Sequence, residues 1–137
     1  MQQFFNRYFS FQGRIGRALF YIRCLYLTLI TTVMAVVTVP LFSNGGRILW
    51  LAGACVVAAA LATLLLGIGS LLVRRLHDIG LSGWHALWVG GAEFGWAFLA
   101  YAPERVMLIA APLGAICAWI LFWPGSAGEN RFGPQRA

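Results

Sequence analysis

Four mostly apolar stretches, separated by short polar or glycine-rich breaks, make up most of this chain. They cover residues 20–42, 48–73, 84–102 and 106–123. An α-helix rises 1.5 Å per residue, so about 20 apolar residues cross the roughly 30 Å hydrocarbon core of a bilayer. The pattern therefore predicts an all-α fold in which residues 1–137 form one membrane domain with four transmembrane helices.

The third stretch, residues 84–102, is the weakest of the four predicted helices. It contains Gly90, Gly91 and Gly95, and glycine lowers the propensity of a segment to form a helix. A second interpretation is therefore that this stretch is a broken or re-entrant segment.

Polar segments flank the apolar stretches at both ends of the chain. In residues 1–19, aromatic side chains alternate with polar and basic ones, which is typical of a segment lying in the membrane interface. The alternative is a short irregular lead-in to the first helix. Residues 124–137 form a short polar tail.

The distribution of arginine predicts the orientation in the membrane. With four spans, eight arginines lie on one side, namely Arg7, Arg14, Arg17, Arg23, Arg74, Arg75, Arg131 and Arg136. Only Arg47 and Arg105 lie on the other side. Cytoplasmic loops carry the excess of basic residues. Both termini, and the break between the second and third stretches, are therefore predicted to be cytoplasmic.

Composition excludes an ordinary soluble domain. The chain is 61% hydrophobic and 10% charged, whereas soluble domains carry about 25% charged residues. The formal net charge is +6. Beside apolar spans, arginine suits anionic lipid head groups, so we expect membrane lipids as partners and no nucleic acid.

The break between the second and third stretches holds the most candidate chemistry. It reads Arg74-Arg75-Leu76-His77-Asp78, followed by a glycine-rich turn. Asp78 lies three and four residues after two arginines, which are neighbouring positions on a helix, so an Asp–Arg pair is expected. One interpretation makes the cluster a topology signal and a helix cap, and the other makes it a contact for lipid or a partner.

Nothing in this cluster predicts an enzyme. His77 and Asp78 are adjacent, so on a helix their side chains point about 100° apart and do not form a ready catalytic pair. The sequence offers no nucleophile with a matching base, no set of metal ligands and no cofactor motif. We expect His77 to bond a backbone carbonyl or a carboxylate.

Glu93 lies near the middle of the third stretch. A carboxylate within a span is costly and usually faces a protein interior or water. Two interpretations remain open: a residue on an ion or solute path, or an acid hydrogen-bonded between helices.

Three blocks of this chain resemble a known family. They are Phe11-Gln12-Gly13-Arg14-x-x-Arg17 with Phe20-Tyr21, then the run from Arg75 to Trp84, then Asn130-Arg131-Phe132-Gly133-Pro134. The family is that of small bacterial inner-membrane proteins catalogued as domain of unknown function 805. The resemblance implies a multi-pass, four-span helical protein with these blocks on the cytoplasmic side. It implies no catalytic role, and Glu93 is not part of its pattern.

The expected function is non-enzymatic, with no cofactor and no metal. We expect binding of anionic lipid, or of a larger membrane complex, through the residues Arg14, Arg17, Arg74, Arg75, His77, Asp78 and Arg131. The alternative is a small transporter or channel subunit, forming a homo-oligomer, with Glu93 on its path.

Overall fold

The computed structural model describes residues 8–44, 46–99, 111–112, 114–115, 118–119 and 121–134. Its helices are α2 (Arg17–Asn44), α3 (Arg47–Asp78) and α4 (His85–Leu99). The all-α prediction is confirmed for these residues.

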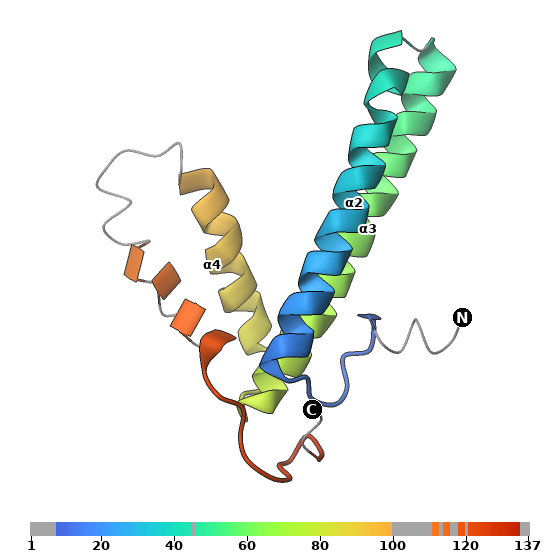
Figure 1. Ribbon diagram of the computed structural model, residues 1–137. Coiled ribbons are helices and arrows are strands. Elements are labelled where there is room, and N and C mark those ends of the chain that lie inside the picture. The colour runs from blue at the N-terminus through green and yellow to red at the C-terminus, as the bar shows by residue number, and fades with distance from the viewer. Residues whose placement is uncertain are drawn as a thin grey trace.

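Helices α2 and α3 form a long antiparallel hairpin (Figure 1). The turn between them is short, and the helices pack side by side down to the end where α3 meets α4. Gly67 is buried in this contact, and a Cβ atom placed there would lie 2.7 Å from Cδ1 of Leu27. The two backbones therefore approach closely because one position carries no side chain.

Most apolar side chains of this hairpin face outwards. Leu25, Val37 and Ile48 are 70%, 67% and 82% exposed, respectively. Large apolar side chains exposed over two whole helices require a cover of lipid or protein. Both helices are long and apolar enough to cross a membrane, over Arg17–Pro40 and Arg47–Asp78.

The prediction of four transmembrane helices is wrong. The described residues contain two helices that are long and apolar enough to cross a membrane. The described part of the third predicted span, residues 84–102, forms the continuous helix α4, whose 15 residues rise only about 22 Å. The fourth, residues 106–123, falls mostly outside the described residues. No contact in the described structure tests which side of the membrane the termini face, so their cytoplasmic placement stays a prediction.

The core of the described part lies at one end of the hairpin, where α2, α3 and α4 converge (Figure 1). Its buried apolar side chains are Tyr8, Ile15, Phe20, Leu27, Leu71, Leu72, Leu76 and Val89. The segment before α2 is mostly irregular and packs against α3: Ser70 donates its hydroxyl to the carbonyl of Tyr8, and the N–H of Ile15 donates to the carbonyl of Arg74 at 3.3 Å.

We predict that Gly67→Leu destabilises the protein, because the added side chain overlaps Leu27 between α2 and α3. Overpacking of this kind costs about 1–3 kcal/mol. The matched control is Gly69→Leu, two residues further along α3, where a Cβ meets nothing within 4 Å. Thermal melting in detergent should show a loss for Gly67→Leu only. Equal melting of the two variants would contradict close packing at Gly67.

Candidate functional site

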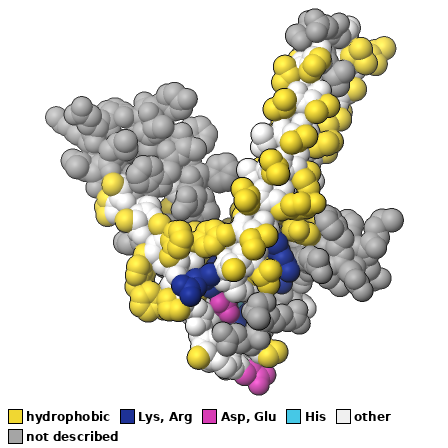
Figure 2. All heavy atoms as spheres, viewed as in Figure 1, with side chains coloured by type: hydrophobic (Ala, Val, Ile, Leu, Met, Phe, Trp, Pro, Cys, Tyr) yellow, Lys and Arg dark blue, Asp and Glu magenta, His cyan; other side chains and the backbone are white. Residues whose placement is uncertain are grey.

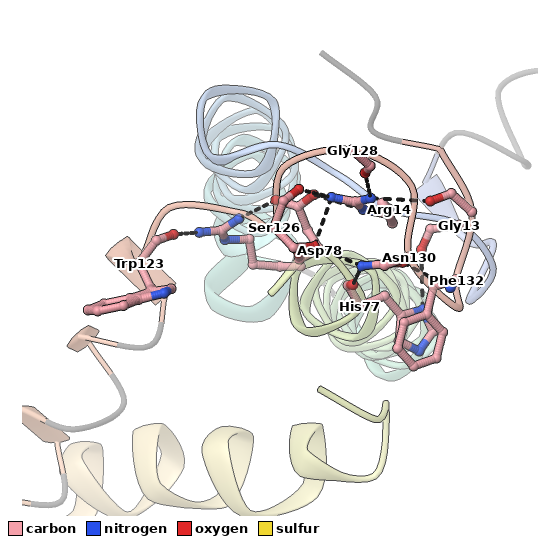
Figure 3. Close-up of polar contacts among 11 residues, drawn as sticks. Gly13, Arg14, His77, Asp78, Trp123, Ser126, Gly128, Asn130 and Phe132 are labelled. Carbon is pink, nitrogen blue, oxygen red and sulfur yellow. Dashed lines mark hydrogen bonds and ion pairs between the residues drawn. The ribbon is translucent and has the colours of Figure 1, made fainter. Parts of the chain in front are cut away.

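Three segments far apart in the sequence meet at the polar end of the hairpin. They are residues 8–16 before α2, the end of α3 with the turn after it, and the tail from residue 121 to residue 134 (Figure 3). These segments contain the second and third blocks that the sequence singles out and the start of the first, Phe11 to Arg14. They meet around one carboxylate, that of Asp78.

Asp78 binds two arginines at once, and we call these three residues, Arg14, Arg75 and Asp78, the ion centre. Its Oδ1 accepts from Nε of Arg14 at 3.1 Å and lies 3.0 Å from Nη2 of the same residue. Its Oδ2 accepts from Nη1 of Arg75 at 2.7 Å. The side chains of both arginines are fully buried, and that of Asp78 is 4% exposed. Buried ions are tolerated only when they are paired and hydrogen-bonded.

Backbone carbonyls satisfy the other N–H groups of these arginines. Arg14 donates through Nη1 to the carbonyl of Gly128 at 2.6 Å and through Nη2 to that of Ser126 at 2.6 Å. Arg75 donates to the carbonyl of Leu121 at 3.1 Å and also to that of Trp123. One carboxylate and several carbonyl dipoles thus solvate two guanidinium groups, and the backbone carbonyls of the tail hold it to these arginines (Figure 3).

The tail also bonds the end of α3 directly. The N–H of Ser126 donates to the carbonyl of Asp78 at 2.8 Å, and Nδ2 of Asn130 donates to the carbonyl of His77 at 3.0 Å. These carbonyls belong to the last turn of the helix, which has no partner for them within the helix. A Cβ atom at Gly125 would overlap the carboxylate of Asp78, so only glycine fits there.

His77 packs between the first and third segments. Its Nδ1 lies 3.2 Å from the carbonyl oxygen of Gly13, and its ring stacks on Phe132 with centroids 3.9 Å apart. His77 was expected to bond a backbone carbonyl or a carboxylate, and the structure confirms the first of these, the carbonyl of Gly13. The expected Asp–Arg pair is also confirmed, as Asp78 with Arg75 three residues earlier.

The remaining predicted site residues separate into buried and exposed ones. Arg74 is buried beside the centre, whereas Arg17 and Arg131 are exposed. Arg17 donates to the carbonyl of Phe122 at 3.3 Å. Arg131 donates to the carbonyl of Gly80 at 3.1 Å and lies over the ring of Phe132. The backbone of Glu93 lies in α4, but its side chain is outside the described part of the structure.

Sequence reasoning missed Gly125 and Ser126, which touch Asp78 most closely from the tail. The available signal was the turn composition of Pro124-Gly125-Ser126-Ala127-Gly128 directly after an apolar stretch. Within the described residues, no group of three or more His, Cys, Asp or Glu side chains is placed to hold a metal ion.

Comparison with known proteins identifies one family. The family model described as protein of unknown function, DUF805, matches residues 8–134, which is nearly the whole chain and includes all three segments of the site. No curated protein and no solved structure matches the chain.

We predict that Asp78→Asn destabilises the protein strongly. The variant leaves two buried guanidinium groups without a counter-charge, and breaking a buried pair costs about 3–5 kcal/mol. Thermal melting in mild detergent is the measurement. The control is Glu129→Gln, which removes an exposed acid from the same tail and should change melting little. If both variants melt alike, the ion centre does not stabilise this end of the molecule.

Proposed function

Because this chain belongs to the DUF805 family, whose function is unknown, we propose a role from its own geometry. It is a non-enzymatic protein of the bacterial inner membrane that binds anionic phospholipid at the arginine-rich end of its helical hairpin. The observation that carries this proposal is the surplus of positive charge at that end, next to the apolar helices.

The charge count supports the proposal. At this end the described residues include the arginines Arg14, Arg17, Arg74, Arg75 and Arg131 against the acids Asp78 and Glu129. Asp78 is shared by Arg14 and Arg75, so the buried centre keeps a formal charge of about +1 by itself. Arg17 and Arg131 add exposed positive charge nearby.

The position of the charge also fits a membrane surface. Arg17 is the first residue of α2, and Arg131 binds the turn that follows α3, so both lie where the apolar helices end. Figure 2 shows hydrophobic side chains up the hairpin and charged ones gathered toward its base. The phosphate layer of a bilayer that covers the hairpin would lie at this level, where each arginine contributes about 1 kcal/mol of attraction.

The contacts of the buried arginines separate the basic residues into two groups, those that bind the tail and those that are exposed. Arg14 and Arg75 are occupied by Asp78 and by tail carbonyls, so their role is to fix the tail. The fixed tail in turn places Arg131 beside Gly80. Lipid recognition therefore falls to the exposed arginines, with the ion centre as their support.

We predict that replacing Arg17 and Arg131 together by Gln lowers retention of phosphatidylglycerol. Two arginines near an anionic surface contribute about 2 kcal/mol, or roughly thirtyfold in affinity. Native mass spectrometry of protein released from mixed phosphatidylglycerol and phosphatidylcholine vesicles measures the retained lipid.

The matched control is Arg47→Gln, which removes an exposed arginine from the opposite end of the hairpin. It should leave the retained phosphatidylglycerol unchanged. Equal retention of both lipids by the native protein would contradict the proposal. A loss in the control equal to that in the double variant would contradict the assignment to this end.

A further inference from the structure

An open apolar cleft separates α3 from α4. Its volume is about 870 Å³, and the two helices diverge from the turn that joins them, as Figure 1 shows. The side of α3 contributes Leu65, Ile68 and Leu72, and the side of α4 contributes Leu87 and Gly91. Such a space between helices in a membrane is filled by lipid or protein, because it offers water no polar partners.

The depth of the cleft matches one leaflet. Along α3 its lining runs from Leu64 to Val73, a rise of about 14 Å. A hydrocarbon core of roughly 30 Å gives each leaflet about half that thickness. A second copy's hairpin would need an apolar groove along the full length of a span, whereas an acyl chain of one leaflet needs only this depth.

We call the end of the cleft at the turn between α3 and α4 its mouth, and this end lies on the arginine-rich side of the hairpin. Ser82, Gly83 and Trp84 line the mouth. The ring of His77 lies against Gly83, because a Cβ atom placed at Gly83 would lie 3.3 Å from Nε2 of His77. Arg131 binds the carbonyl of Gly80, two residues before Ser82. Of the acids whose side chains are described, Asp78 and Glu129, neither lines the cleft. The charge at the mouth therefore favours a phosphate.

We infer that the cleft between α3 and α4 holds an acyl chain of an anionic phospholipid, whose phosphate lies at the mouth beside Arg131. This inference rests on the proposed function and adds to it the place of the apolar part of the lipid. Trp84, 79% exposed at the mouth, suits the head-group layer, where tryptophan is enriched.

The test uses phosphatidylglycerol that carries a photoactivatable diazirine in one acyl chain, incorporated into phosphatidylcholine vesicles with the full-length protein. After illumination, mass spectrometry maps the crosslinked peptides. We expect crosslinks concentrated in 64–73 and 84–91, and competed by unlabelled phosphatidylglycerol more strongly than by phosphatidylcholine.

The matched variant fills the cleft with two added side chains. A Cβ at Gly69 or Gly91 meets nothing within 4 Å, so Gly69→Leu with Gly91→Leu adds two side chains at open positions of the cleft lining. Cleft crosslinks should fall roughly fivefold or more, while melting stays near that of the native protein. The control, Ala59→Leu, lies exposed on α3 outside the cleft and should change nothing.

Several results would overturn the inference. Crosslinks that spread evenly over the outer faces of α2 and α3, and that do not change in the variant with Gly69→Leu and Gly91→Leu, would show annular lipid only. A crosslink-dependent dimer through α4 would show a second copy in the cleft. If the exposed arginines still govern phosphatidylglycerol retention while the cleft gives no crosslinks, the proposed function stands and this inference falls. If phosphatidylglycerol is not preferred in either assay, both fall.

Discussion

The carboxylate of Asp78, shared by Arg14 and Arg75, is the interaction on which the described structure depends. It joins the segment before α2, the end of α3 and the tail, and the backbone hydrogen bonds of the tail reinforce this junction. Two buried cations on one anion are stable because tail carbonyls complete their solvation. The tail is therefore part of the ion centre, since its backbone supplies the missing negative potential.

Part of this centre could be predicted from the sequence. The pair between Arg75 and Asp78 follows from helical spacing, and the three polar blocks are visible as interruptions of apolar runs. The contact of Arg14 with Asp78 joins residues 64 positions apart, and no local period encodes it. The backbone carbonyls that accept hydrogen bonds from the arginines could not be predicted from the sequence. Every residue carries a carbonyl, and the side-chain pattern does not indicate which ones bind arginine.

The count of transmembrane helices failed for a related reason. Apolar runs record composition, whereas the ends of a helix depend on the contacts at its termini. Helix α3 continues past its apolar run to Asp78, because the ion centre lets its last turn carry buried charge. Helix α4 begins at His85, and its described residues, to Leu99, rise only about 22 Å, which is less than the hydrocarbon core of a bilayer. The net charge of the chain likewise overstates the number of arginines that can bind a ligand, since buried arginines add to the charge without being accessible.

Arg14 and Asp78 act as one unit that holds the tail. A double-mutant cycle in thermal stability tests it most directly, using Arg14→Gln, Asp78→Asn and the combined variant. A coupling of about 1–3 kcal/mol is expected, so that the double variant loses much less stability than the two single losses added together. Additive losses, with a coupling near zero, would show that Arg14 and Asp78 stabilise the protein independently of each other.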